Sequence, residues 1–246
     1  MSWIGGKKSL RELIVTLFPL YYERYIEVFG GGGWVLFHKL PGNDFEVYND
    51  FNGLLVNLYR CVREKPQELM AALAYCLNSR ADFELVKNAL ARDSPASDVQ
   101  KAAWVYQLIR YSYASGLTSY GSQPHDIRSN FPLIEQAHRR LAKVVIENKD
   151  FEKLIGQYDR PVSFFYADPP YWKLAGYGVE FGIEHYEELA ELMQTCQGKI
   201  MLSINDHPDI RAIYKDFNID ETKLSYTVGR NTKSREKKQE LIITNY

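Results

Sequence analysis

An uncharged run of aromatic and β-branched residues, Val162–Ala167, constrains the fold of this chain more than any other feature. A run of this composition predicts a buried β-strand. It is followed directly by Asp168-Pro169-Pro170-Tyr171, so an acid and two prolines stand where the strand must end. In an open α/β sheet, ligands bind at the carboxyl ends of the strands. We therefore expect an α/β fold that uses Asp168 and its neighbours for function.

The first part of the chain predicts the opening of a Rossmann-like βαβ unit. Tyr25–Phe29 has the composition of a strand and is followed by four glycines, Gly30–Gly33. A short helix is expected over 34–40 and a second strand over 45–48, which ends at Asp50. Strand, glycine turn, helix, strand and acid in this order are typical of nucleotide-binding α/β proteins.

The middle of the chain predicts helices without strands. Between Gly53 and Gly116, apolar residues recur at helical spacing in four successive segments. A polar loop follows over 117–130, and then a helix over 132–143. We interpret residues 53–143 as a helical insertion, and residues 1–52 with 144–246 as the domain that carries it.

Strands and helices alternate again towards the end of the chain. The remaining strands are expected over 144–147, 200–204, 224–228 and 241–245, and helices over 8–17, 185–196 and 209–215. The last two strands form a terminal hairpin, which adds antiparallel pairs to a parallel sheet. The prediction is an α/β fold with a mixed, mostly parallel seven-stranded sheet.

Composition limits the possible partners. The net charge is −1 and the pI is about 6.5, so positive charge for a polyanion must be gathered locally. Three cysteines without CxxC or metal-ligand spacing predict reduced thiols, a cytoplasmic location and no metal site. The N-terminal apolar run is too short to span a bilayer and has no signal-peptide pattern, which predicts no membrane contact.

The glycine turn and Asp50 predict a nucleoside site. The dinucleotide pattern GxGxxG fails, because its last glycine would fall on Val35 or Leu36. The turn still lets the backbone approach a ligand closely, which suits a nucleoside with an uncharged linker. Asp50 stands where a carboxylate can accept hydrogen bonds from ribose hydroxyls, and Phe51 could pack on an adenine. A tight turn and a helix-capping acid are the structural alternatives.

The Asp-Pro-Pro-Tyr segment predicts chemistry on an exocyclic amine. The lone pair of such an amine is delocalised into the base, so the nitrogen is a poor nucleophile. Hydrogen bonds from the NH₂ group to the Asp168 carboxylate and the Pro169 carbonyl would bias the nitrogen towards tetrahedral geometry. Pro169 and Pro170 carry no competing N–H and stiffen the backbone, and Tyr171 offers a ring for an extruded base. A strand that simply ends in a proline turn is the structural alternative.

Five segments in this order resemble one family, the Dam-type (D12 class) DNA adenine-N6 methyltransferases. They are Trp3-Ile4-Gly5-Gly6-Lys7, the turn Phe29–Gly33, Asp168-Pro169-Pro170-Tyr171, Ser203-Ile204-Asn205-Asp206 and the ending Arg230-Asn231…Arg235…Glu240-Leu241. The resemblance spans nearly the full chain and is loosest in the helical insertion.

The resemblance implies a Rossmann-like methyltransferase that moves a methyl group from S-adenosyl-L-methionine to N6 of a flipped-out adenine in double-stranded DNA. The implied cofactor residues are Trp3, Lys7, Phe29, Gly30, Gly31, Gly32, Gly33, Asp50, Phe51 and Asp168. The implied catalytic residues are Asp168, Pro169, Pro170 and Tyr171. It further implies a monomer in the cytoplasm, bacterial or phage-encoded, and leaves open a companion restriction endonuclease.

Two segments are expected to contact DNA. Arg230, Lys233, Arg235 and Lys237 lie in a basic loop between two predicted strands, which suits phosphate contacts. Basic and aromatic residues also alternate around the polar loop of the insertion, where Arg110, Tyr120 and Arg128 are the candidates. The family resemblance places recognition of the DNA bases in this region. A solvated polar loop is the alternative reading, and the insertion shows no clear hairpin.

Two other functions are compatible with parts of the pattern. Some ribosomal-RNA guanine-N2 methyltransferases use similar Pro-Pro-Tyr motifs, but they normally lack the N-terminal element and the helical insertion. A catalytically silent nucleic-acid-binding module would not need Asp168 and Tyr171. Enzymes that methylate cytosine N4 more often have serine at the position of Asp168.

Overall fold

The computed structural model describes residues 7, 10–113, 116–174, 181–223 and 239–246, which form two compact units. Unit 1 comprises Met1–Val15, Gly30–Gly42 and Glu46–Lys149, and unit 2 comprises Thr16–Phe29, Asn43–Phe45 and Asp150–Tyr246. The predicted division into residues 1–52 with 144–246 and an insertion over 53–143 follows other boundaries and stays a prediction.

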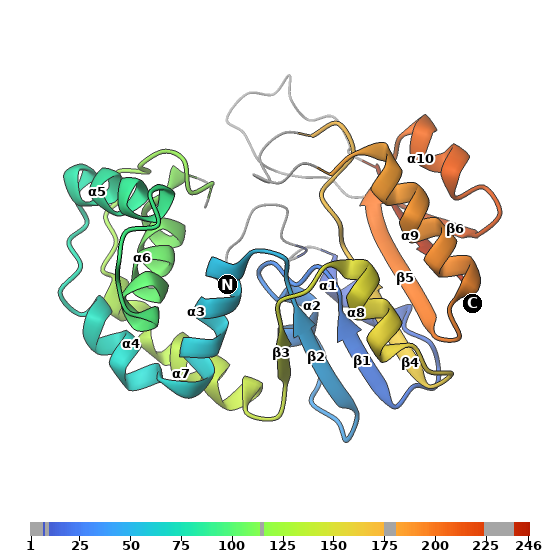
Figure 1. Ribbon diagram of the computed structural model, residues 1–246, viewed down its shortest axis with the longest axis horizontal. Coiled ribbons are helices and arrows are strands. Elements are labelled where there is room, and N and C mark those ends of the chain that lie inside the picture. Colours follow the sequence, from blue (N-terminus) through green and yellow to red (C-terminus); the bar gives the residue numbers. More distant parts are fainter. Residues whose placement is uncertain (1–6, 8–9, 114–115, 175–180, 224–238) are drawn as a thin grey trace. The chain divides into compact units, whose positions relative to one another are not determined.

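The strands form one seven-stranded sheet with the order β3-β2-β1-β4-β5-β7-β6 (Figure 1). The strands are β1 (Arg24–Glu27), β2 (Phe45–Asn49), β3 (Val145–Glu147), β4 (Ser163–Ala167), β5 (Lys199–Asn205), β6 (Asn218–Lys223) and β7 (Gln239–Thr244). The pairs β2–β3, β1–β4 and β4–β5 are parallel, whereas β7 is antiparallel to β5 and β6. The predicted mixed, mostly parallel α/β sheet is confirmed.

Unit 1 contains the helical segment that was expected after the second strand (Figure 1). Its helices are α2 (Trp34–His38), α3 (Gly53–Glu64), α4 (Pro66–Leu73), α5 (Arg80–Ala91), α6 (Asp98–Tyr111), the 3₁₀ helix η2 (Ile127–Asn130) and α7 (Phe131–Leu141). Asn52, Ser79 and Ser97 cap α3, α5 and α6 by accepting hydrogen bonds from backbone N–H groups. The apolar face of α3 packs against α6 and α7, which buries the helical core.

A short antiparallel turn interrupts the helical segment after α6. Ser112 and Tyr120 form an antiparallel bridge, the N–H of Tyr113 donates to the carbonyl of Ser119 at 2.8 Å, and the N–H of Gly121 donates to that of Tyr111 at 2.7 Å. This bridge is isolated and lies outside the named strands, so it does not contradict the expectation that the insertion has no clear hairpin. The pairing is too short to leave an alternating apolar pattern in the sequence, so periodicity could not reveal it.

Among its described residues, unit 2 contains β1, β4, β5, β6 and β7 with three helices, and the N-terminal helix α1 (Arg11–Thr16) has residues in both units. The helices are α8 (Phe151–Tyr158), α9 (Ile183–Thr195) and α10 (Pro208–Ile213), and α8 and α9 lie side by side (Figure 1). All five residues of β4 are buried. Among the helices described, none combines the length and the apolarity that a membrane crossing needs.

Two elements of unit 2 differ from expectation. Helix α8 was not predicted, because an eight-residue helix gives only two turns of periodicity. The strand expected over 224–228 lies outside the described residues, and the structure has a strand that was not expected, β6 at Asn218–Lys223, paired with β7. Its sequence NIDETK is polar, so it carries no strand pattern.

Candidate active site

The Asp-Pro-Pro-Tyr segment stands directly after β4 in unit 2, as the sequence predicted. Asp168 is half-buried, Pro169 is buried, and Pro170 and Tyr171 are half-buried. The Oδ1 atom of Asp168 accepts a hydrogen bond from the hydroxyl of Ser203 on β5 at 3.3 Å. The carboxylate therefore lies at the end of two adjacent parallel strands, the position where α/β proteins bind ligands.

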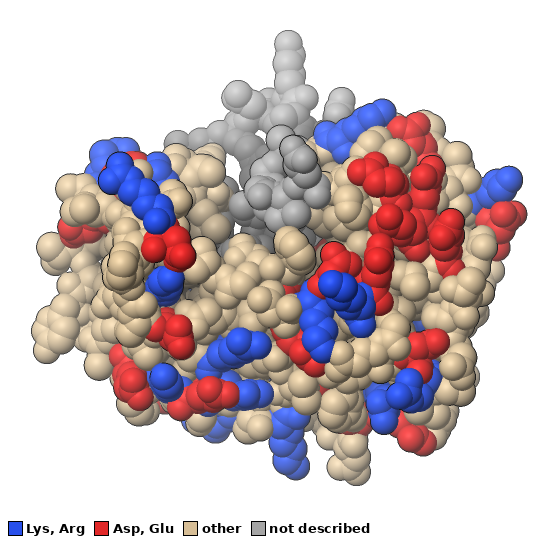
Figure 2. All heavy atoms as spheres, viewed as in Figure 1, with Lys and Arg blue, Asp and Glu red and all other residues tan. Residues whose placement is uncertain are grey.

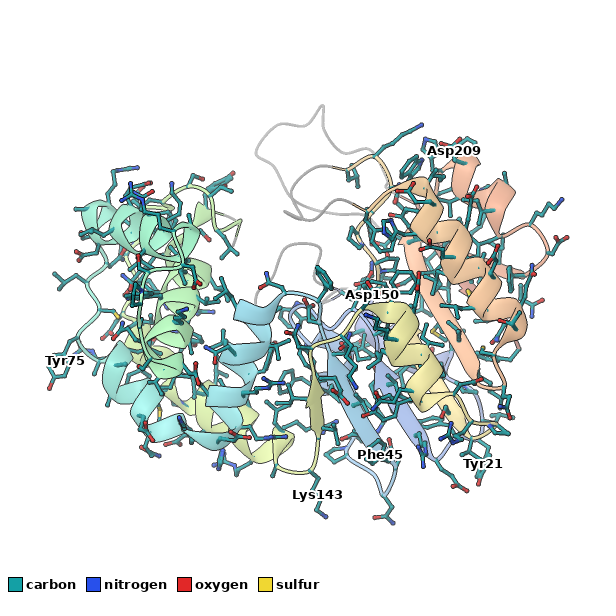
Figure 3. The ribbon with its side chains drawn as sticks, viewed as in Figure 1. Tyr21, Phe45, Tyr75, Lys143, Asp150 and Asp209 are labelled. Carbon is teal, nitrogen blue, oxygen red and sulfur yellow. The ribbon has the colours of Figure 1, made fainter. Side chains whose placement is uncertain are left out.

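The segment from β5 to α10 holds the residues that follow Tyr171. The side-chain amide of Asn205 donates to the backbone carbonyl of Trp172 at 3.2 Å. Asp209, at the start of α10 (Figure 3), accepts from Trp172 Nε1 at 2.8 Å and from Lys173 Nζ at 3.0 Å. These donors lower the pKa of Asp209. Lys173 has a φ of 57°, so the loop turns sharply where Asp209 holds it.

Helix α9 supports the same loop from within unit 2. The hydroxyl of Tyr186 donates to the carbonyl of Pro170, and Tyr214 in turn donates to the carbonyl of Tyr186 at 2.9 Å. Burial raises the pKa of Tyr186, so its hydroxyl stays protonated and remains a donor. The ring of Trp172 meets the ring of Tyr186 edge-on, with centroids 5.8 Å apart. The loop is thus fixed on several sides before any substrate binds.

Phe29, a predicted cofactor residue, belongs to an aromatic cluster of unit 2. Its ring lies 5.7 Å from that of Phe151, the first residue of α8, and 5.7 Å from that of Phe181, just before α9. Phe181 also stacks on His185 with centroids 4.8 Å apart. The cluster packs the carboxyl end of β1 against the starts of two helices, with its rings tilted or edge-on to one another.

The glycine turn lies in unit 1 and is shaped by Tyr48. A Cβ atom at Gly30 would lie 2.2 Å from Cε2 of Tyr48, and Gly31 and Gly33 have φ values of 48° and 64°. The hydroxyl of Tyr48 donates to the carbonyl of Gly31 at 2.8 Å. Gly32 is buried. The glycines are therefore required by the backbone conformation and by close packing.

Asp50 is joined to this turn by its carboxylate. Its Oδ2 accepts from the N–H of Gly31 at 2.8 Å, and its Oδ1 accepts from the N–H of Asn52 at 2.8 Å. Burial raises the pKa of Asp50, and the two N–H donors oppose that shift. Each carboxylate oxygen has two lone pairs, so these bonds orient the group and leave acceptor capacity.

The other predicted cofactor residues have different surroundings. Lys7 is 2% exposed, so it is not a solvated lysine, and its carbonyl accepts from the N–H of Arg11, the first residue of α1, at 2.8 Å. Phe51 is 62% exposed, which leaves its ring open to a ligand. Trp3 lies outside the described residues.

A nucleoside carrying an uncharged linker fits the residues of unit 1. Any side chain at Gly30 would collide with Tyr48, so the turn keeps its backbone bare beside an oriented carboxylate. Ribose hydroxyls are donors that such a carboxylate can accept. In the described part of the chain, no group of three or more His, Cys, Asp or Glu side chains could hold a metal ion.

Two of the predicted DNA-binding residues of the insertion are engaged within unit 1. Arg110 donates to the side chain of Asn130, and Tyr120 donates to Oδ1 of Asn78 at 2.8 Å and lies beneath Arg80. These two bonds brace the polar loop. Arg128 is exposed, and it pairs with Asp126 at 2.9 Å.

The described surface of unit 2 has an acidic face, whereas its predicted DNA-binding residues are not described. Arg230, Lys233, Arg235 and Lys237 lie outside the described residues. Acidic side chains gather over α9 (Figure 2); they are Glu184, Glu187, Glu188 and Glu191. Because these carboxylates repel phosphates, that helix face is unsuited to a DNA backbone.

Several residues that shape the site were not predicted from the sequence. Ser203 and Asn205 lie in the segment that was noted only for its resemblance, and Asp209 was seen only as a helix start. In the same segment, Asp206 pairs with Arg211 at 2.6 Å, which lowers the pKa of Asp206. The closely spaced polar residues in and after the buried strand β5 were the sequence feature that could have indicated their role.

Comparison with known proteins gives consistent results. The model of the D12 class N6 adenine-specific DNA methyltransferases matches residues 3–228. A type II methyltransferase of Lactococcus lactis, M1.LlaDCHI, is 29% identical over 270 residues, covering 100% of this chain and 94% of the relative. The DNA adenine methylase of Haemophilus influenzae is 27% identical over 274 residues, covering 98% and 91%, and that of Vibrio cholerae is 26% identical over 271 residues, covering 98% and 94%.

This match decides between the functions that the sequence left open. A family model that covers most of the chain supports neither a guanine-N2 methyltransferase of ribosomal RNA nor a silent binding module, and the expected adenine-N6 activity is confirmed. The Asp-Pro-Pro-Tyr loop, the glycine turn and Asp50 all lie within the matched residues. The chain therefore belongs to the D12 class N6 adenine-specific DNA methyltransferase family.

Proposed function

We propose that this DNA adenine-N6 methyltransferase takes its methyl group from S-adenosyl-L-methionine and activates a flipped-out adenine with Asp168 and the carbonyl of Pro169. The observation that carries this proposal is the way in which Asp168 is held. Asp168 lies at the end of a fully buried strand, and residues of β5, α9 and α10 fix the loop that follows it. A carboxylate held in this way binds a substrate in one orientation.

In this mechanism the residues of unit 2 act on the target base. Asp168 and the Pro169 carbonyl accept hydrogen bonds from the N6 amino group and raise the electron density on its nitrogen. Tyr171 stacks on the extruded adenine. When bound, S-adenosylmethionine would supply a methyl group on a positively charged sulfur, so that the N6–CH₃ bond would form as the S–CH₃ bond breaks and S-adenosylhomocysteine leaves. The spare N6 proton then leaves to water, so no strong general base is needed.

The residues of unit 1 bind the cofactor in this proposal. Asp50 accepts hydrogen bonds from the ribose hydroxyls, and the bare backbone of the glycine turn approaches the cofactor between its ribose and its methionine part. Lys7 and Trp3 hold the methionine end. The oriented carboxylate of Asp50 and the exposed ring of Phe51 support this assignment.

Double-stranded DNA is the proposed macromolecular substrate. Arg128 of the insertion and the basic residues Arg230, Lys233, Arg235 and Lys237 contact phosphates, and the loop that includes the short antiparallel turn contacts bases. The exposure of Arg128 and of the Tyr113 ring, 72% exposed, supports this role for the loop. The double change Lys233→Ala with Lys237→Ala is expected to weaken binding to all DNA sequences alike.

One experiment tests the chemistry and finds the target together. The purified protein is incubated with S-adenosylmethionine and a random DNA library, and modified adenines are located by sequencing. Asp168→Ala should bind S-adenosylmethionine normally in calorimetry and methylate no site. Asp216→Ala, an exposed aspartate of the same unit, is the matched control and should methylate normally. Near-normal turnover by Asp168→Ala would refute the proposed activation.

A further inference from the structure

Three side chains of unit 2 form a linear hydrogen-bonded chain that ends on Asp168. The hydroxyl oxygen of Tyr166 lies 2.8 Å from Oγ of Ser203, and the Ser203 hydroxyl donates to Oδ1 of Asp168 at 3.3 Å. Tyr166 and Ser203 are buried, at 1% and 0% exposure. Buried hydroxyls this close to a reactive carboxylate are costly to place unless their hydrogen bonds are used.

Strand geometry brings the three groups to one face of the sheet. Tyr166 and Asp168 are two positions apart, so their side chains point to the same side. The parallel register pairs Tyr166 with Met201, and two positions on, this register sets Ser203 beside Asp168. The chain of hydrogen bonds is therefore a direct consequence of how β4 and β5 align.

The direction of this chain of hydrogen bonds follows from the environment of Tyr166. Burial and the negative charge of Asp168 raise the pKa of Tyr166 well above its ordinary value, and two further acids, Glu27 of β1 and Glu240 of β7, act in the same direction. Tyr166 is thus protonated and donates to Ser203. The single proton of Ser203 is then directed to Asp168.

The far end of the hydrogen-bonded chain shows what it can do. It terminates in a phenol that is 1% exposed, so along this route no proton can pass from Asp168 to water. A chain of donors that ends in the interior can orient a carboxylate and stabilise its charge, but it cannot relay a proton to solvent.

We infer that Ser203 is a positioning residue for methyl transfer, which holds the Asp168 carboxylate in its ionised form and in the orientation that accepts the N6 amine, and that Tyr166 fixes the Ser203 hydroxyl for this task. The inference rests on the proposed function of Asp168. It gives the serine of the Ser203-Ile204-Asn205-Asp206 segment a physical role in the reaction.

The test compares two fully buried, hydrogen-bonded serines of the sheet, only one of which contacts Asp168. Ser203→Ala removes the donor to Asp168. Ser163→Ala is the matched control, because Ser163 is also 0% exposed and its hydroxyl also makes a hydrogen bond, to the carbonyl of Tyr158 at 2.6 Å, at the opposite end of β4. Thermal unfolding of both variants measures any loss of stability that is common to the two.

Four results are expected if Ser203 positions Asp168. In Ser203→Ala, kcat falls about tenfold to a hundredfold, as for a lost hydrogen bond to a charged group, while the Kd for S-adenosylmethionine stays the same. The acid limb of the kcat–pH profile moves to higher pH, because without its donor the carboxylate binds a proton more readily. Ser203→Thr, which keeps the hydroxyl, restores most of kcat. Tyr166→Phe gives a smaller loss of kcat than Ser203→Ala.

Equal activity of the two serine variants would contradict the inference. If kcat of Ser203→Ala equals that of Ser163→Ala and the acid limb of the profile does not move, Ser203 does not position Asp168. If Asp168→Ala is inactive in the same assay, only this inference fails and the proposed function stands. If Asp168→Ala is active, the proposed function fails first.

Discussion

Glu46 of β2 and Arg140 of α7 form a bidentate ion pair that joins the first strand of unit 1 to the last helix of the insertion. The two contacts measure 2.6 Å and 2.7 Å, and Lys39 binds the same carboxylate at 2.9 Å. Arg140 also donates to the carbonyl of Leu36 at 2.9 Å. All three charged side chains are largely buried. The pair anchors the insertion to the strand that leads to Asp50.

Loss of this carboxylate should destabilise the protein. Glu46→Gln leaves two buried cations without their anion, and we expect the free energy of unfolding to fall by about 3–5 kcal/mol. Denaturant unfolding measures this value. Glu84→Gln, which breaks the more exposed pair of Glu84 with Lys87, is the control and should cost less than about 1 kcal/mol. Equal losses in the two variants would contradict the anchoring role.

A methyl group at Gly30 should damage the cofactor site. In Gly30→Ala the new Cβ would meet Tyr48 at 2.2 Å, so the ring that supports the turn must move. We expect a loss of about 1–3 kcal/mol in stability and of about tenfold in affinity for S-adenosylmethionine. Gly156→Ala in α8 is the control, because nothing lies within 4 Å of its Cβ. It should raise stability by up to about 1 kcal/mol and leave binding unchanged.

Affinity for S-adenosylmethionine should depend on the ionisation of Asp50. Burial raises the pKa of Asp50 above 3.8, and a protonated carboxyl is a poorer acceptor for ribose hydroxyls. Calorimetric affinity should therefore fall as the pH is lowered through the raised pKa of Asp50. Asp50→Asn should bind more weakly with a flatter profile, and an unchanged profile in that variant would assign the dependence to another group.

The raised pKa of Asp50 gives folding stability the opposite dependence on pH. A carboxyl whose pKa is higher in the folded state contributes most to stability below its unfolded pKa. That contribution is lost as the pH rises through the raised value. Thermal unfolding without cofactor should therefore show a contribution to stability that decreases as the pH rises through the raised pKa of Asp50, and Asp50→Asn, which has no carboxyl to titrate, should lose this pH dependence.

The hydrogen bond from the indole N–H of Trp172 to Asp209 should contribute to kcat. Trp172→Phe keeps an aromatic ring against Tyr186 and loses the donor to Asp209, so the loop after Tyr171 is held less firmly. We expect kcat to fall a few-fold, with the Kd for S-adenosylmethionine unchanged. Lys173→Ala removes only a solvent-exposed partner of the same carboxylate and should change little. A larger effect of Lys173→Ala would reverse this assignment.

Arg128 should contribute to DNA affinity through phosphate contacts. Arg128→Ala is expected to weaken binding to specific and random duplexes alike, and to reduce the slope of log affinity against log salt by about one. Fluorescence anisotropy over a range of salt concentrations measures both. Arg92→Ala, another exposed arginine of unit 1, is the control and should leave the slope unchanged.

Local sequence patterns predicted the elements that carry the chemistry. Buried strand β4 could be read from its composition, and Asp168 from its place at the strand end. The four glycines and Asp50 could be read in the same way. Helix α8, strand β6 and the short turn after α6 were missed, because their sequences are too short or too polar to leave a periodic pattern.

The amino-acid sequence by itself determined the α/β class, the position of the glycine turn with Asp50, and the place of the Asp-Pro-Pro-Tyr segment at a strand end, since each depends on residues that are neighbours in the chain. Only the tertiary structure decided that Ser203 meets Asp168, that Asp209 holds Trp172, and that Glu46 binds Arg140 from 94 positions away. The physical reason is that strand register and helix packing minimise the free energy of the whole fold. Contacts between distant segments therefore leave no local pattern in the sequence.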